Sequence, residues 1–146
     1  MSLIFDGFDD WPENQPVIEC YVDGELRDLH NCAWFDGMWW RSFGELWFWF
    51  DYDDRLCGGT ARSRRLGLGF GDVRGLAVEQ VADFDPREGR TFESVWYRSN
   101  ATTASDVEIQ AGGLMATFIA RWVRLWEEPG PDKDAASEED SPAASL

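Results

Sequence analysis

The sequence predicts a β-rich α+β fold, in which an antiparallel β-meander of about six strands carries one C-terminal helix packed on the sheet. Tight-turn dipeptides separate short apolar runs in the first half of the chain, which is typical of a meander. Apolar residues recur at helical spacing between 105 and 126. The last twenty residues are rich in Pro, Ala, Ser and acids. We therefore expect a single globular domain over 1–126 and a disordered acidic tail over 127–146.

Three turn signals follow one another in the meander. Asp23-Gly24 ends a strand at 17–22 and begins a second one at 25–35, which a break near Asn31 can divide. Asp36-Gly37 repeats the signal, because glycine tolerates the positive φ of a type I′ turn. Gly44-Glu45 fits a type II′ turn between strands at 38–43 and 46–52.

The last predicted hairpin belongs to a stretch, residues 34–54, that holds ten of the 22 aromatic residues of the chain. With a two-residue loop at Gly44-Glu45, Trp40 pairs with Trp49 on one face and Trp39 with Phe50 on the other. A hairpin with two apolar faces needs a cover on each side. Either both covers come from the chain itself, or one face is left as a tryptophan platform for a protein or sugar partner.

Residues 53–75 change character, because they are rich in glycine and arginine. Gly67, Gly69 and Gly71 alternate with large apolar residues, so a strand here would have bare backbone on one face, against which something can pack closely. The spacing matches no dinucleotide-binding or phosphate-binding loop. Further strands are expected at 76–84 and 90–98.

The segment 105–126 supports two interpretations. Ser105 and Glu108 form a capping box, and Val107, Ala111, Leu114, Phe118, Trp122 and Leu125 keep helical spacing, so we predict a helix over roughly 113–127. The alternative is a hairpin that turns at Ala111-Gly112-Gly113, because two consecutive glycines weaken a helix. Both interpretations place this segment in the core.

Charge is the strongest compositional signal. The chain has a net charge of −15, and residues 1–54 alone hold 13 acids and two arginines, whereas 55–74 hold five arginines and one acid. Such a field repels nucleic acid and anionic membranes and speeds association with basic proteins. The alternative is that the acids only keep the protein soluble.

The sequence contains no recognisable catalytic motif, so an enzyme is not predicted. The single histidine, His30, has no nucleophile motif nearby. Cys20, Cys32 and Cys57 are expected to be free buried thiols, and with His30 they match no zinc signature. Acids beside tryptophans at 45–54 meet the needs of a glycosidase or a calcium loop only loosely. We expect no cofactor and no metal.

These observations favour a non-enzymatic acidic interaction protein that binds and inhibits a basic protein, of which nucleic-acid-binding proteins are one class. Bacterial immunity proteins and phage anti-defence inhibitors that imitate nucleic acid share this general character, but no residue match links the chain to a family. No apolar run is long enough to span a membrane, and the first residues lack a basic signal region, so a cytoplasmic setting is expected. The alternatives are a structural subunit, for example of a phage particle, that uses the tryptophan-rich hairpin as an interface, and a small carboxylate-dependent enzyme. The predicted partner-binding residues are Asp6, Asp9, Asp10, Trp40, Trp47, Trp49, Asp51, Asp53 and Asp54.

Overall fold

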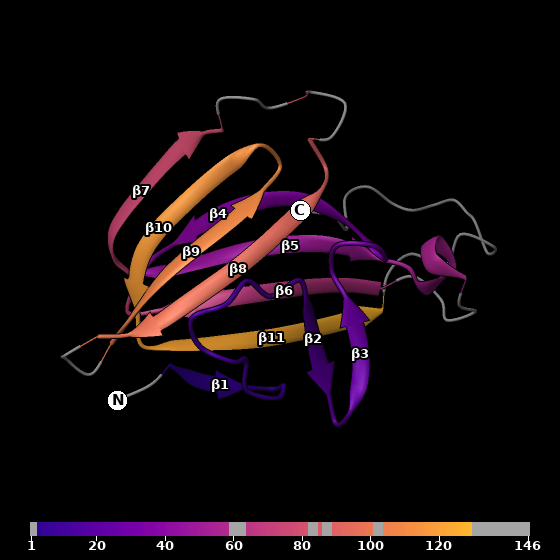
Figure 1. Ribbon diagram of the computed structural model, residues 1–146, viewed down its shortest axis with the longest axis horizontal. Helices are drawn as coiled ribbons and strands as arrows, with labels where there is room; N and C mark the ends of the chain where they lie inside the picture. Colours follow the sequence, from indigo (N-terminus) through magenta and orange to yellow (C-terminus); the bar gives the residue numbers. More distant parts are fainter. Residues whose placement is uncertain (1–2, 59–63, 82–84, 86–88, 101–103, 130–146) are drawn as a thin grey trace.

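Two antiparallel-rich sheets packed face to face make up the computed structural model (Figure 1). It describes residues 3–58, 64–81, 85, 89–100 and 104–129. The five-stranded sheet has the order β1-β11-β6-β5-β4, and the four-stranded sheet has the order β7-β10-β9-β8. A separate hairpin of β2 and β3 lies across the end of the sandwich near β6 and β11 (Figure 1).

The elements follow one another in short segments. The strands are β1 (Ile4–Asp6), β2 (Glu19–Val22), β3 (Glu25–Asp28), β4 (Ala33–Arg41), β5 (Glu45–Tyr52), β6 (Arg64–Gly71), β7 (Arg74–Gln80), β8 (Phe92–Ser99), β9 (Ser105–Ala111), β10 (Leu114–Ala120) and β11 (Trp122–Pro129). One 3₁₀ turn, η1 (Asp54–Cys57), follows β5. Among the described residues no helix is long and apolar enough to cross a membrane.

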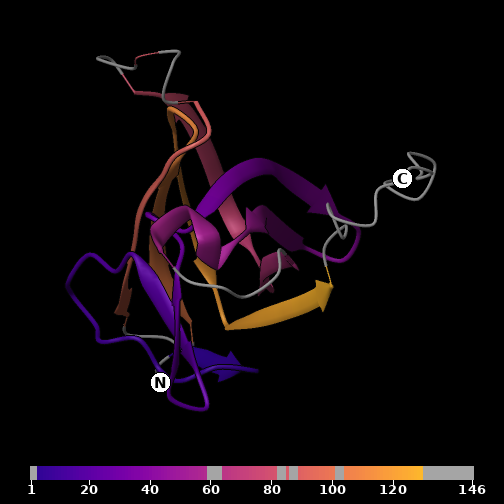
Figure 2. The ribbon, with the colours of Figure 1, turned by 90° about the vertical axis from the view of Figure 1, so that its right-hand side faces the viewer.

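A bent two-stranded ribbon joins the two sheets. β6 pairs with β11 in one sheet, and the same two chain segments continue as β7 and β10, which pair in the other sheet. The bends fall at Asp72, whose φ is 54°, and at Arg121, whose N–H donates to the Gly71 carbonyl at 3.0 Å. Figure 2 shows this corner, where yellow β11 turns away from orange β10. Strands that change sheet at a bend are a common way to build the corner of a sandwich.

The core lies between the sheets and is aromatic at its centre. Phe118 of β10 contacts Phe70 of β6 with ring centroids 5.0 Å apart, and it stacks on Phe48 of β5 at 6.4 Å. Phe50 of β5 meets Phe92 of β8 edge-on at 5.4 Å. Alternation along β5 and β6 thus sends one set of side chains into this core and the other set to the opposite face.

The predicted C-terminal helix is wrong, and the fold is therefore all-β rather than α+β in the part of the chain that is described. Residues 105–126 form β9, β10 and the start of β11. Gly112 and Gly113, with φ of 61° and 80°, make the two-residue turn between β9 and β10 that the alternative interpretation placed there. The apolar residues resembled a helical pattern because they come from three short consecutive strands. The alternation of buried and exposed positions is interrupted at the glycine turn and again at Arg121.

The simple six-strand meander is also wrong, because the described residues form eleven strands, arranged in two sheets and a hairpin. The turn at Asp23-Gly24 is confirmed, with φ of 51° and 84°. Asp36-Gly37, however, is a bulge inside the single strand β4, since Phe35 pairs with Phe50 and Gly37 with Trp49.

The register of the β4–β5 hairpin differs from the predicted one. Arg41 pairs with Glu45, so the loop has three residues rather than two. This shift by an odd number of residues exchanges the two faces, and Trp39 now pairs with Trp47 while Trp40 pairs with Leu46. Phe43, which was predicted to end a strand, lies in the loop instead. Its φ of 67° is left-handed, as is the φ of 73° at the neighbouring Gly44.

The expectations of three free cysteines and of a tail that begins at residue 127 are also wrong. Cys32 and Cys57 form a disulfide that ties η1 to the start of β4, so only Cys20 is a free thiol among the three. Residues 127–129, expected to begin the tail, end β11 instead. The remainder of the predicted tail, 130–146, lies outside the described residues.

Candidate binding surface

The outward face of the five-stranded sheet carries six of the nine tryptophans of the chain. We call this surface the tryptophan face. Strand alternation places its members opposite the core-facing phenylalanines, on three of the five strands. The six are Trp34 and Trp39 on β4, Trp47 and Trp49 on β5, and Trp122 and Trp126 on β11.

Three glycines on β6 form the floor beneath these rings. A Cβ on Gly67 would stand 2.7 Å from Cζ3 of Trp49, and Cβ atoms on Gly69 and Gly71 would collide with the rings of Trp47 and Trp122. The rings therefore lie flat over bare backbone, from β5 on one side and from β11 on the other. This confirms the prediction that something packs closely against the bare face of the strand.

Arginine side chains lie over three of the rings of this face. The Arg65 guanidinium is 4.8 Å from the centroid of Trp49, and that of Arg124 is 5.2 Å from Trp122. Arg90, which precedes β8, reaches Trp34 at 5.6 Å. These distances are those of cation–π contacts, which are strongest with tryptophan. The chain thus covers part of its own tryptophan face with cations.

The remaining part of the face is open to solvent. Trp39 is 58% exposed and Trp126 is 50% exposed, and among the described residues no guanidinium lies over either ring. Trp34 is 46% exposed beside its arginine. Exposed tryptophans gathered on one face are uncommon on proteins that bind nothing.

The predicted tryptophans of the hairpin lie in three different environments. Trp47 is only 5% exposed, and its indole N–H donates to Glu45 at 3.0 Å. Trp49 stacks on Trp47 with centroids 5.4 Å apart and is partly buried. Trp40 lies on the other side of β4, and it is half exposed because β4 is an edge strand. The residues with the most open rings on this face, Trp39 and Trp126, were not among those predicted.

Three of the predicted acids pair with arginines of the chain itself. Asp6 accepts from Nε of Arg124 at 2.7 Å, and Asp51 lies 3.2 Å from Nη2 of Arg90 and 3.6 Å from Nη1 of Arg65. Asp53 is buried and caps η1 by accepting from the Arg55 backbone N–H at 3.0 Å. Its carboxylate also pairs with the Arg55 side chain at 2.9 Å.

The other predicted acids lie away from the tryptophan face. Asp9 and Asp10 line a pocket of about 300 Å³ between the N-terminal arm and β2, together with Glu19 and Tyr21. The Tyr21 hydroxyl donates to Glu19 at 2.9 Å. Asp54 is the first residue of η1 and is half-buried. The nine predicted residues therefore do not form one site.

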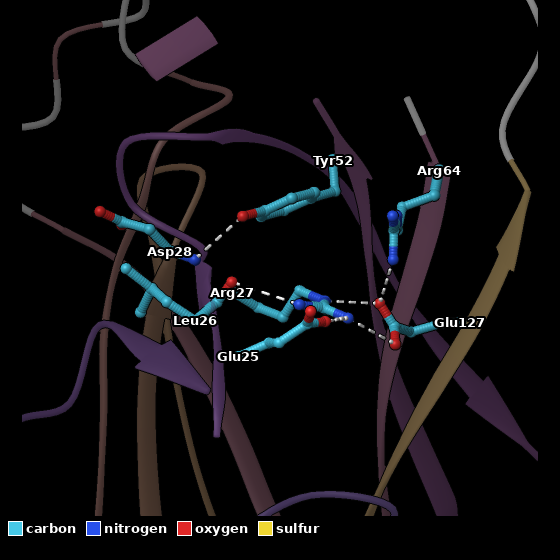
Figure 3. Close-up of polar contacts among 7 residues, drawn as sticks. All are labelled: Glu25, Leu26, Arg27, Asp28, Tyr52, Arg64 and Glu127. Carbon is cyan, nitrogen blue, oxygen red and sulfur yellow. Dashed lines mark hydrogen bonds and ion pairs between the residues drawn. The ribbon is translucent and has the colours of Figure 1, made fainter. Parts of the chain in front are cut away.

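A polar cluster fixes the β2–β3 hairpin to the main sheet (Figure 3). Nε of the buried Arg27 donates to Glu127 at 2.8 Å, and Nη2 lies 3.5 Å from Glu25. Arg64 approaches the same Glu127 carboxylate at 3.3 Å. Burial alone would raise the pKa of Glu127, but the hydrogen bond and charge of Arg27, followed by those of Arg64, hold this pKa below its usual value. Each charge has a partner, so the cluster has the character of a structural anchor.

The side chains of Tyr52 and His30, near this cluster, make hydrogen bonds to the backbone. The Tyr52 hydroxyl accepts from the Asp28 backbone N–H at 3.4 Å, and burial raises the pKa of this phenol to about 12. The imidazole of His30 lies 2.6 Å from the Phe92 carbonyl, to which Nδ1 donates. Neither group lies beside a nucleophile in these contacts.

The cysteines provide at most a partial metal site. Both sulfurs of the Cys32–Cys57 pair and a carboxylate oxygen of Asp54 lie within 4.8 Å of one another, and within the described ranges they are the one such group. The two sulfurs are bonded to each other, so neither is a thiolate ligand. Cys20 is fully buried, and burial raises the pKa of its thiol.

The chain matches no protein-family model, and neither a curated protein nor a solved structure is significantly similar to it.

Sequence reasoning missed the members of the surface that come from β11. Trp122 and Trp126 were assigned to a helix, where they would not share a face with Trp34 or Trp39. The alternation of Trp122, Arg124, Trp126 and Glu128 with Val123, Leu125 and Glu127 has the period of a strand, and this signal could have placed them.

Proposed function

We propose that the protein is a non-enzymatic binding protein that captures and inhibits a basic, nucleic-acid-binding protein through the tryptophan face. The observation that carries the proposal is the exposure of Trp34, Trp39 and Trp126 on one side of a rigid sheet. Tryptophan is enriched at the energetic centres of protein interfaces. A sheet holds such side chains in fixed positions, which lowers the entropic cost of binding.

The charge of the chain favours a basic partner. A net charge of −15 attracts a cationic protein at long range, and the carboxylate of Glu128 lies at an exposed position among the tryptophans. The exposed carboxylate of Asp36 already pairs with Arg65 at 3.2 Å. The acidic pocket at Asp9 and Asp10 offers a second contact for basic side chains, away from the main face. Electrostatic complementarity of this kind raises the association rate and is weakened by salt.

Replacing tryptophans of the face tests the proposal. The wild-type protein and the Trp34→Ser/Trp39→Ser variant are used as baits in extracts of the source cell, with crosslinking at low salt. A Trp96→Ser variant is the matched control, because Trp96 carries an arginine at 5.6 Å but lies on the four-stranded sheet. We expect wild type and control to capture the same basic protein, and the double variant to lose most of it. Equal capture by all three baits would refute the proposed function.

A second candidate function, a subunit of a larger assembly, is favoured by the open edge at β7. Among the described strands β7 pairs with β10 alone, and all of its residues except the partly buried Leu76 are exposed. Exposed edge strands are templates for pairing with another chain. Light scattering at high protein concentration separates the two functions: growth in mass beyond that of one chain, 16.7 kDa, favours assembly, and a clean monomer favours the binding protein.

A cytoplasmic setting remains part of the proposal. Disulfides are rare in a reducing cytoplasm, so the state of Cys32 and Cys57 in the cell tests it. Rapid alkylation of the source cells should trap both as free thiols if the protein works there, whereas an intact disulfide would contradict the cytoplasmic setting.

A further inference from the structure

The tryptophan face repeats one arrangement three times. In each case a guanidinium lies over a tryptophan ring and also pairs with a carboxylate of the same face. Arg65 lies over Trp49 and donates to Asp36 at 3.2 Å. The same guanidinium lies 3.6 Å from Asp51, which is two residues further along β5 than Trp49. Residues two apart on a strand point to the same side, so the ring and the carboxylate are neighbours.

The other two cases use neighbouring strands. Arg90 lies over Trp34 and pairs with Asp51, which is directly opposite Trp34 in the sheet. Arg124 lies over Trp122, and its Nε donates to Asp6 at 2.7 Å, with Asp6 and Arg124 opposite each other in β1 and β11. A ring together with an adjacent carboxylate is thus the unit that holds an arginine on this surface.

A fourth unit of the same kind has no arginine among the described residues. Trp126 and Glu128 stand two apart on β11, and the Trp126 indole N–H donates to Glu128 Oε2 at 3.2 Å. Half of the Trp126 side chain is exposed, and Glu128 is exposed as well. The hydrogen bond holds the indole edge against the carboxylate and leaves the carboxylate other acceptor positions.

We infer that Trp126 and Glu128 form a seat for an arginine side chain of the basic partner. The inference rests on the proposed function, and it adds the chemical class of the group that the surface receives. Arginine suits the seat better than lysine, because its planar guanidinium stacks on an indole and still donates in-plane hydrogen bonds to a carboxylate. The three arginines on this face combine a ring contact with a hydrogen bond to a carboxylate: Arg65 donates to Asp36, Arg90 to Asp51 and Arg124 to Asp6.

Octa-arginine and octa-lysine peptides serve as probes, titrated by calorimetry at one fixed ionic strength. We expect the wild-type protein to bind octa-arginine more tightly than octa-lysine. Trp126→Leu should weaken octa-arginine binding by about 3- to 30-fold, which is the range of a cation–π contact. Octa-lysine binding should change by less than about 2-fold in the same variant, since it depends on net charge.

Two variants guard against misfolding and non-specific charge effects. Trp126→Phe keeps an aromatic ring and should retain part of the preference for arginine, and Trp96→Leu on the other sheet should retain all of it. Equal affinity of wild type for the two peptides, or octa-arginine binding that is indifferent to Trp126→Leu, would overturn the arginine seat. Either result would leave the proposed function intact if the Trp34→Ser/Trp39→Ser variant still fails to capture the basic protein. Conversely, equal capture by all three baits together with a normal preference for octa-arginine would refute only the proposed function.

Discussion

The ring of Trp49 lies over the bare Cα of Gly67, so closely that a Cβ there would stand 2.7 Å from Cζ3. This relationship explains why a strand in the middle of a five-stranded sheet contains alternating glycines. Glycine normally weakens a strand interior, because it has no side chain to pack and a larger entropy to lose. Here the packing comes from the neighbouring strands, whose indole rings occupy the space above the backbone.

Gly67→Ala should destabilise the protein by about 1–3 kcal/mol, as overpacking of a filled space does. The physical reason is the collision with Trp49, so the same substitution in a Trp49→Leu background should cost clearly less. Urea unfolding of the four proteins in this cycle measures the coupling. If Gly67→Ala costs the same in both backgrounds, the ring is not what requires glycine.

Arg27→Ala should lower the free energy of unfolding by about 3 kcal/mol, because it leaves the Glu127 carboxylate partly buried with Arg64 as its remaining cation. The matched control is Arg27→Met/Glu127→Leu, which removes both charges and keeps the volume. Such replacements are often neutral. A double variant as unstable as Arg27→Ala would argue against an electrostatic origin of the loss.

The same carboxylate makes stability depend on pH in a definite direction. The pKa of Glu127 is lowered in the folded state by Arg27 and Arg64, which overcome the effect of burial. Its contribution is therefore fully present above the unfolded pKa of about 4.3, and it is lost as the pH falls through the lower folded value.

Urea unfolding of wild type and Glu127→Gln between pH 7 and pH 3 isolates this contribution from that of the other acids. We expect a constant difference in unfolding free energy above about pH 5 and a shrinking difference below about pH 4. A difference that grows on acidification would have the wrong sign for a lowered pKa.

Reduction of the Cys32–Cys57 disulfide should lower the unfolding free energy by about 3 kcal/mol, from the loop entropy of its sequence separation of 25 residues. Thermal melting with and without a dithiol reductant measures the change, and Cys32→Ala/Cys57→Ala should not respond to the reductant. Thiol titration of the unreduced, unfolded protein should find one thiol, that of Cys20. Three thiols in that titration would contradict the disulfide.

The sequence predicted local features better than long-range ones. The Asp23-Gly24 turn and the bare face of the β6 strand follow from backbone preferences of single residues, and both are confirmed. The partner strands of β6 could not be read in this way. β11 comes from more than fifty residues later in the chain, and its pairing places the ring of Trp122 over Gly71, a contact that local sequence does not reveal.

The placement and pairing of the predicted site residues differ from those expected for two physical reasons. A loop of three rather than two residues shifted the register of the β4–β5 hairpin by an odd number, so Trp40 was assigned to the surface that Trp39 occupies. The acids were counted as free because composition does not show pairing, whereas Asp6 and Asp51 each pair with arginines distant in the sequence.

The most direct test of the account is oxidative footprinting of the tryptophans, by mass spectrometry, with the protein free and with its captured partner. In the free protein Trp39 and Trp126 should be oxidised readily, because they are 58% and 50% exposed, and the buried Trp47 should not. Binding should protect Trp39 and Trp126 and leave Trp96 of the four-stranded sheet unchanged. Protection of Trp96 with no change at Trp39 and Trp126 would contradict the tryptophan face as the binding surface.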